Sequence, residues 1–213
     1  MILAPGDFDD LLTSLGQQFI WRKAYACPCS NPSSGAANPA CPVCSGKGWT
    51  WDATGVQGVA GVPNTNPRKV MAQFGIYEPG DAMLTIPQAS PIYSIGHMDR
   101  VMALNSPRPF TETLVHDGTD QLYWYVPGII VSRVFWLDPT GQTIIEGGLP
   151  TVNADGTLTW QTEEPPAGAE YSITGSRLAE YYVYSDIAAN RMEQSGSRLP
   201  VKVHLRSFDL FGR

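Results

Sequence analysis

The sequence has 213 residues, of which 43% are hydrophobic and only 16% charged, with 21 glycines and 18 prolines. This composition excludes an intrinsically disordered chain, which needs low hydrophobicity and high net charge, and it excludes long solvated helices, which need abundant Glu, Lys and Arg. The formal net charge of −6 excludes a general electrostatic affinity for DNA or acidic membranes. We therefore expect a folded, turn-rich protein built mainly from short strands.

Two further features bear on the compartment. No stretch approaches the roughly 18 apolar residues that cross a bilayer, and the first ten residues carry Asp7, Asp9 and Asp10 where a secretory signal carries bases. The sequence therefore predicts synthesis in the cytosol and no membrane partner. All four cysteines lie within residues 27–44, whereas a disulfide scaffold distributes its cysteines along the chain.

In chain order, the first predicted element is a short helix over residues 7–15. Asp7 can cap this helix, its leucines form an apolar stripe, and Gly16 ends it. Strands are then predicted at 68–77, 82–86 and 99–104, with a turn at Glu78-Pro79-Gly80-Asp81.

Near the end of the chain, strands are predicted at 181–184 and 201–206, and both are expected to return to the same sheet. In 201–206 apolar and basic residues alternate, which predicts a strand with one solvent-facing side. The two ends of the chain thus belong to one host domain, predicted at 1–110 plus 177–213.

The middle of the chain has its own charge balance. Residues 111–180 hold ten of the twenty acidic residues but only Arg133 and Arg177 as bases. Ser106-Pro107-Arg108-Pro109 and a predicted turn at Gly175-Ser176 flank this stretch, which predicts an inserted domain at 111–176. Strands inside it are predicted at 121–125, 129–137, 142–146, 157–160 and 171–174.

The spacing of these strands suggests their arrangement, because turns that recur roughly every 8–12 residues are typical of sandwiches. The fold class predicted for the whole chain is mainly β. We expect a β-barrel or sheet host domain with a short N-terminal helix, a metal-binding loop with four cysteines, and an inserted small β-sandwich.

The strongest chemical signal is the cysteine cluster at 27–48. Cys27-Pro28-Cys29 is followed, after eleven residues, by Cys41-Pro42-Val43-Cys44-Ser45-Gly46-Lys47-Gly48. Four thiolates suit the tetrahedral geometry of zinc, and glycines behind a Cys-x-x-Cys turn allow backbone N–H groups to point at the sulfurs. Cys27, Cys29, Cys41 and Cys44 are therefore the predicted ligands of a structural zinc ion.

Other interpretations of the four cysteines stay open. An iron–sulfur cluster uses the same ligands. Redox cycling through Cys41 and Cys44 is a further alternative, although the Gly-rich segment after Cys44 differs from a thioredoxin-like motif. Residues 41–48 also resemble one repeat of the zinc domain of DnaJ-type chaperones, but that domain has several repeats and this chain has one.

The sequence offers little for catalysis. Four thiolates on one metal ion would close its coordination shell, which leaves no position for an activated water. The three histidines, His97, His116 and His204, are scattered, and neither a His-Glu-x-x-His motif nor a Gly-x-Ser-x-Gly motif is present. We expect that the protein is not an enzyme.

The C-terminal segment carries apolar side chains that need either a core or a partner. Phe208, Leu210 and Phe211 lie close to the terminus, and Arg206 precedes them in a segment rich in bases. These four residues are the predicted interface, and packing into the protein's own barrel is the alternative. Tyr123, Trp124, Trp136 and Trp160 form either the core of the inserted domain or an exposed platform for a sugar or a protein.

As a whole, the chain resembles the neck proteins of tailed bacteriophages, of the head-to-tail connector or head-closure (stopper) type. The resemblance lies in the run from Arg22 into the cysteine loop, the Glu78-Pro79-Gly80-Asp81 turn, Asp99-Arg100-Val101, the acidic β insertion, and the ending from Leu199 to Phe211. Typical stoppers are shorter and lack both the cysteine loop and the insertion. A baseplate or tail-tube component, or a carbohydrate- or protein-binding β module, therefore remains an alternative.

The resemblance implies a structural role. Such proteins form rings, commonly of six or twelve copies, that join the portal complex of the capsid to the tail. The expected partners are other copies of the chain and other neck, portal-adaptor or tail proteins, and DNA passes through the channel only as cargo. The implied location is the virion, assembled in the host cytoplasm. The loop at 87–97 is then a candidate for the channel face.

Overall fold

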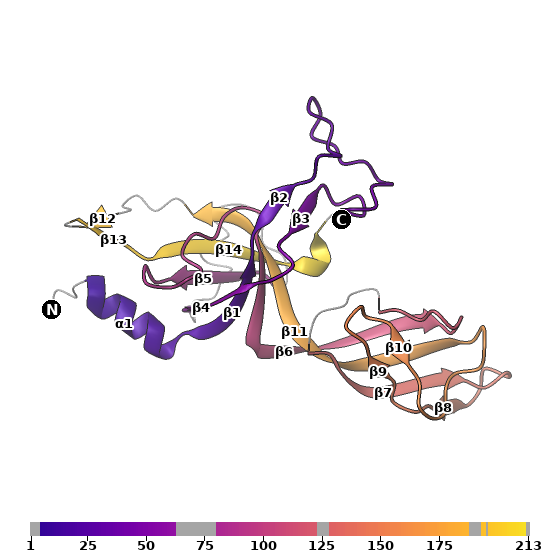
Figure 1. Cartoon of the computed structure of the whole chain (residues 1–213). Helices are drawn as coiled ribbons and strands as arrows, with labels where there is room; N and C mark the ends of the chain where they lie inside the picture. The colour runs from indigo at the N-terminus through magenta and orange to yellow at the C-terminus, as the bar shows by residue number, and fades with distance from the viewer. Residues whose placement is uncertain (1–4, 63–79, 123–127, 188–192, 195, 212–213) are drawn as a thin grey trace. The chain divides into compact units, whose positions relative to one another are not determined.

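A computed structural model describes residues 5–62, 80–122, 128–187, 193–194 and 196–211. The predicted mainly β architecture is confirmed, with one short N-terminal helix and a large antiparallel sheet (Figure 1). The chain divides into two compact units, residues 1–105 with 180–213, and residues 106–179. Within the described residues, no helix has the length and apolar character needed to cross a membrane.

The first unit is built on a sheet with the strand order β4-β1-β6-β11-β14-β5. These strands are β1 (Gln17–Arg22), β4 (Val56–Ala60), β5 (Ala82–Ile86), β6 (Arg100–Val115), β11 (Glu170–Ile187) and β14 (Val201–Ser207). On β14, Leu205 is paired in antiparallel register with Val183 on β11 and with Ala82 on β5. The strand predicted at 82–86 is thus confirmed at those bounds.

In the part of the chain that the structure describes, the two edges of this sheet approach each other without forming a closed barrel. Gly61, which follows β4, makes an isolated antiparallel bridge with Thr85 on β5. Two hydrogen bonds of 2.8 Å form the bridge, one from each backbone N–H to the carbonyl oxygen of the other residue. The prediction left a β-barrel and a sheet open for the host domain, and the structure has a sheet.

The core of the first unit lies on the sheet. Phe19, Leu84, Ile92, Val101 and Leu205 are almost completely buried, and burial of such side chains is the main stabilising contribution to a fold of this kind.

Helix α1 (Pro5–Leu15) confirms the predicted helix and begins two residues earlier. Its Leu12 lies so close to Gly61 that a Cβ there would be 2.6 Å from a Leu12 methyl carbon. Glycine at position 61 therefore allows the helix to pack closely against the end of β4.

In the second unit, β7 (Ile130–Leu137) pairs with β11 on one side and with β8 (Ile144–Glu146) on the other. A small hairpin is formed by β9 (Thr151–Val152) and β10 (Leu158–Thr159). The buried core cluster of this unit consists of Phe110, Leu122, Val134, Trp136, Tyr171 and Ile173. Leu158 and Trp160, which are half-buried, pack against this cluster.

The turn predicted at one border of the insertion is wrong. Gly175-Ser176 is not a turn, because β11 continues through it. At the other border, Ser106-Pro107-Arg108-Pro109 lies inside β6, where the second unit begins. At Gly175 the register shifts by a bulge, and a Cβ there would lie 2.1 Å from the carbonyl oxygen of Ile130. The glycine thus marks a close backbone approach between two strands.

Two prolines lie in β6, beyond the part of the strand that pairs with β1. Pro107 and Pro109 are two residues apart, so their missing N–H groups face the same edge of the strand. On the side of β1, the pairing of β6 ends at Ala103. Neither proline therefore removes a hydrogen bond from that ladder.

The prediction that one side of 201–206 faces solvent is also wrong. His204 and Arg206 are buried, because both reach the fully buried carboxylate of Asp81.

Three predicted elements cannot be compared because they lie wholly or partly outside the described residues. They are the strand predicted at 68–77, the first part of the turn predicted at 78–81, and most of the strand predicted at 121–125. Two further short strands, β12 (Glu193–Gln194) and β13 (Ser197–Arg198), pair with each other.

Candidate metal centre

The four cysteines lie beyond the end of a short hairpin. Strands β2 (Ala24–Ala26) and β3 (Trp49–Trp51) pair over three residues, and the chain between them forms the cysteine loop (Figure 1). Directly after the ladder, the N–H of Cys27 donates a hydrogen bond of 2.8 Å to the carbonyl oxygen of Gly48. The stem therefore brings the first and last residues of the 27–48 loop together.

The sulfur atoms converge on one point. The Sγ atoms of Cys27, Cys29, Cys41 and Cys44 all lie within 4.8 Å of one another. Cys27 Sγ is 3.9 Å from Cys41 Sγ, and Cys29 Sγ is 3.5 Å from Cys44 Sγ. A regular tetrahedron of sulfurs around zinc, with bonds of about 2.3 Å, has edges of about 3.8 Å. The predicted clustering of four thiols that could bind one metal ion is therefore confirmed.

Backbone N–H groups point at the sulfurs, as the glycines behind the Cys-x-x-Cys turn predict. The N–H of Gly48 donates to Cys44 Sγ over 3.3 Å. Hydrogen bonds from the N–H groups of Cys44 and Val43 lower the pKa of the Cys41 thiol to about 6. For Cys44, burial raises the pKa of the thiol, but the bond from Gly48 and the neighbouring thiols bring it below its ordinary value. Such N–H donors stabilise thiolates, which are the form that binds metal.

The pKa of the Cys29 thiol is shifted in the opposite direction from those of Cys41 and Cys44. A backbone hydrogen bond at Asn38 lowers the pKa of Cys29, but burial and the hydrogen bonds with the other three thiols raise it to about 12. Several negative sulfurs cannot be held this close without a compensating positive charge. A bound divalent cation would supply that charge, and binding it would displace thiol protons.

Local turns give the loop its shape. The Asn31 carboxamide oxygen accepts hydrogen bonds from the N–H groups of Ser33 and Ser34, at 2.8 and 3.2 Å, and the Asn38 oxygen accepts one from Ala40 at 3.0 Å. At Gly46, φ is +77°, and a Cβ there would lie 3.2 Å from the carbonyl oxygen of Pro39. Glycine is required at this position both for its left-handed backbone and for the close approach.

The sulfur separations favour a single ion over a polynuclear cluster. An iron–sulfur cluster places its own iron and sulfide atoms between the cysteine sulfurs and so spreads them further apart. Edges of 3.5 and 3.9 Å match one tetrahedral ion instead. Four sulfur ligands would leave no coordination position open on such an ion.

The predicted interface residues belong to β14 and to the turn that follows it. Phe208 is 2% exposed and belongs to the core of the first unit, and Arg206 is 9% exposed and reaches Asp81. Leu210, in the 3-10 helix η1 (Phe208–Leu210), and Phe211 are half-buried. That this segment contacts a neighbouring molecule stays a prediction, and Leu210 and Phe211 are the residues that retain accessible surface for it.

The aromatic residues of the second unit form no exposed platform within the part that the structure describes. Trp136 is buried and Trp160 is half-buried, and both belong to the core of that unit. Tyr123 and Trp124 lie outside the described residues. The loop at 87–97 also contributes to a core, because Ile92 and Ile95 are buried and the Tyr93 hydroxyl donates to the carbonyl oxygen of Leu199 over 2.9 Å.

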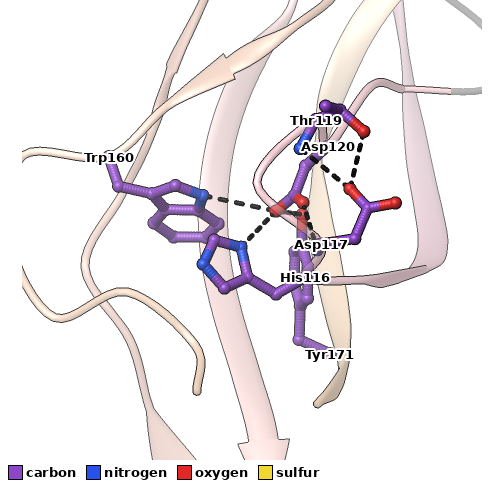
Figure 2. A network of polar contacts seen from close by, with 6 residues as sticks. All are labelled: His116, Asp117, Thr119, Asp120, Trp160 and Tyr171. Atoms are coloured by element: carbon purple, nitrogen blue, oxygen red, sulfur yellow. Dashed lines mark hydrogen bonds and ion pairs between the residues drawn. The ribbon is translucent and has the colours of Figure 1, made fainter. Parts of the chain in front are cut away.

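The histidines are engaged in local contacts. His204 Nε2 is 3.0 Å from Asp81 Oδ2, and the ring of His97 lies edge-on to Trp49 at 6.4 Å. His116 Nδ1 is 2.6 Å from Asp120 Oδ2, which also accepts from the Tyr171 hydroxyl at 2.9 Å (Figure 2). In this network the buried Asp120 joins groups from separate segments of the second unit.

Sequence reasoning missed the buried carboxylates that organise the first unit. Asp99 is 1% exposed and accepts hydrogen bonds from three donors, and Asp81 is buried between His204 and Arg206. Their partners are far away in the sequence, so no local pattern signals them.

No protein-family model matches the chain, and a search of curated proteins found no match.

Proposed function

We propose that the four cysteines bind one zinc ion, which braces the loop and takes no part in catalysis. The observation that carries this proposal is the convergence of the four Sγ atoms within 4.8 Å of one another. Zinc fits better than a polynuclear cluster because the sulfur separations match a single tetrahedral ion. The ion would neutralise the thiolates and hold together a loop that is rich in small polar residues.

We further propose that the chain is a structural component of a tailed-phage virion, a ring-forming connector or stopper between the portal complex and the tail. The resemblance of the sequence supports this role, and a closed four-sulfur site is consistent with a building block rather than an enzyme. The charge distribution also fits passage of DNA without retention. The 106–179 unit holds nine acidic and three basic residues, so it offers no net attraction to phosphate.

The test is metal analysis combined with native mass spectrometry on the same preparation of the full chain. The proposal predicts about one zinc ion per chain and a closed oligomer, six or twelve copies for a ring. Cys44→Ser removes a ligand and should abolish stoichiometric zinc, whereas Ser33→Ala, in the same loop but not a ligand, should leave it intact. A metal-free wild type with ordered thiols contradicts the zinc assignment.

The two halves of the proposal fail separately. If the protein binds zinc but stays monomeric at high concentration, the ring proposal is wrong and the metal-centre proposal stands. Incubation of the zinc-loaded protein with purified tailless capsids, followed by electron microscopy, then distinguishes a neck component from a baseplate or tail-tube component. Glycan-array binding by the same sample would favour the alternative of a carbohydrate-binding β module.

A further inference from the structure

The hairpin that carries the cysteines packs against the C-terminal turn of the chain. Trp51, the last residue of β3, lies edge-on to Phe208 with ring centroids 5.3 Å apart and edge-on to Phe211 at 5.5 Å. Phe208 and Phe211 stack on each other at 5.4 Å. The Trp51 side chain, at the base of the β2–β3 hairpin, therefore forms part of the surface against which η1 packs.

Other residues of the first unit complete this surface. The Arg100 guanidinium lies 4.3 Å from the ring centroid of Phe208 and 5.7 Å from that of Trp51. Two of the three guanidinium nitrogens, Nε and Nη2, donate hydrogen bonds to the two carboxylate oxygens of Glu180, and this pair holds the guanidinium plane in place. The ring of Tyr182 lies edge-on to Phe211 at 4.9 Å. Three separate segments thus hold the C-terminal turn, and the hairpin supplies one of them.

The stability of the β2–β3 hairpin depends on the groups that close the end carrying the cysteine loop. Its ladder has only three residue pairs, Ala24↔Trp51, Tyr25↔Thr50 and Ala26↔Trp49. A two-stranded ribbon this short is marginal by itself in water. One end is tied to the body of the unit, since Trp51 Nε1 donates to the carbonyl oxygen of Met98 over 3.0 Å. The other end is closed by the four sulfurs, so an ion there would restrict the whole ribbon, including the backbone at Trp51.

We propose that metal binding at the four cysteines and docking of the C-terminal turn are thermodynamically coupled through Trp51. The bound ion stabilises the β2–β3 ribbon, the ribbon holds the Trp51 indole against Phe208 and Phe211, and loss of the ion loosens residues 208–211. This inference rests on the metal centre of the proposed function and is independent of the phage role. Coupling between two sites is reciprocal, so weakening the turn also weakens metal binding.

The first test is hydrogen exchange on the full wild-type chain, with zinc bound and after removal of zinc by a chelator under reducing conditions. The coupling predicts that amides in the C-terminal peptide covering 208–211 exchange at least about fivefold faster without zinc. Peptides from β7, which lies in the other unit, serve as the internal reference and should exchange at the same rate in both states. Equal exchange of the 208–211 peptide with and without zinc overturns the proposal.

The second test reads the coupling in the opposite direction. Zinc affinity is measured by competition with a chromophoric chelator for wild type, Phe211→Ala, and Phe8→Ala as a matched control on an exposed helix residue. Phe211→Ala should weaken zinc binding about fivefold or more although Phe211 is no ligand, and Phe8→Ala should leave it unchanged. Phe211→Leu, which keeps an apolar contact, should fall between wild type and Phe211→Ala.

The outcomes separate this inference from the metal assignment. If wild type binds no zinc, the metal centre fails and the coupling fails with it. If wild type binds zinc but Phe211→Ala and Phe8→Ala have the same affinity as wild type, the coupling alone is wrong.

Discussion

The indole Nε1 of Trp21 donates a hydrogen bond of 2.7 Å to Oδ2 of Asp99, 78 residues away in the sequence. Asp99 is 1% exposed and also accepts from the backbone N–H groups of Ala24 and Gly96, at 2.7 and 2.8 Å. Both carboxylate oxygens of Asp99 therefore accept hydrogen bonds. The carboxylate joins β1, the start of the metal hairpin and the loop before β6.

Asp99→Asn should destabilise the first unit. An amide has one acceptor oxygen, so its NH2 group must face either the N–H of Ala24 or the N–H groups of Trp21 and Gly96. We expect the free energy of unfolding to fall by about 1–3 kcal/mol, the cost of buried polar groups without partners. Urea denaturation measures this, with the exposed Asp52→Asn as the control that should change little. Equal stability of the two variants would contradict this role for Asp99.

Arg206→Ala distinguishes a core role from an interface role for this residue. Asp81 is fully buried, and removal of the guanidinium takes away a positive charge beside its carboxylate. Removing one partner of a buried ion pair costs about 3–5 kcal/mol. Thermal unfolding should show this loss at a fixed zinc concentration, while Lys202→Ala, an exposed base on the same strand, should be neutral. If Arg206→Ala changes oligomerisation but not unfolding, Arg206 acts at an interface and not in the core.

Asp120 predicts a pH dependence for the second unit. Burial raises its pKa, but hydrogen bonds from His116 and Tyr171 and from the N–H of Asp117 bring the pKa below the ordinary value of 3.8. A group with a lowered pKa in the folded state stabilises that state at pH values above its unfolded pKa, and this contribution is lost as the pH falls through the folded value. Asp120→Asn should therefore cost about 1–3 kcal/mol at pH 7.

The measurement for Asp120 is unfolding monitored between pH 7 and pH 2. The difference between wild type and Asp120→Asn should shrink once the pH falls below 3.8. Glu164→Gln, an exposed carboxylate of the same unit, is the control and should follow the wild type. A difference that stays constant with pH would show that the charge of Asp120 does not contribute.

Gly175→Ala tests the bulge in β11. The new Cβ would lie 2.1 Å from the carbonyl oxygen of Ile130 and 3.0 Å from a ring carbon of Phe110, so the two strands would have to separate. We expect a loss of about 1–3 kcal/mol, as for overpacking. Thermal unfolding measures the loss. Gly6→Ala, where a Cβ has no neighbour within 4 Å in helix α1, should be neutral or slightly stabilising. Unchanged stability of Gly175→Ala would mean that β7 and β11 are not held this closely.

Much of the fold follows from local sequence. The helix at the N-terminus, the strand at 82–86 and the strand around 130–137 were each predictable, because their apolar periodicity and flanking turns act over a few residues. The clustering of Cys27, Cys29, Cys41 and Cys44 was predictable for the same reason, since short spacings and glycine turns leave the sulfurs few other positions.

What the sequence alone determined is therefore the mainly β class and the identity of the four candidate ligands. Only the tertiary structure decided that Gly175 lies inside a long strand, that Arg206 and His204 are buried, and that Trp51 links the cysteine hairpin to Phe208. Each of these depends on a partner far along the chain: Ile130, Asp81 and the C-terminal turn. A local pattern records the conformation a segment prefers, but burial and pairing are set by which distant segments it meets.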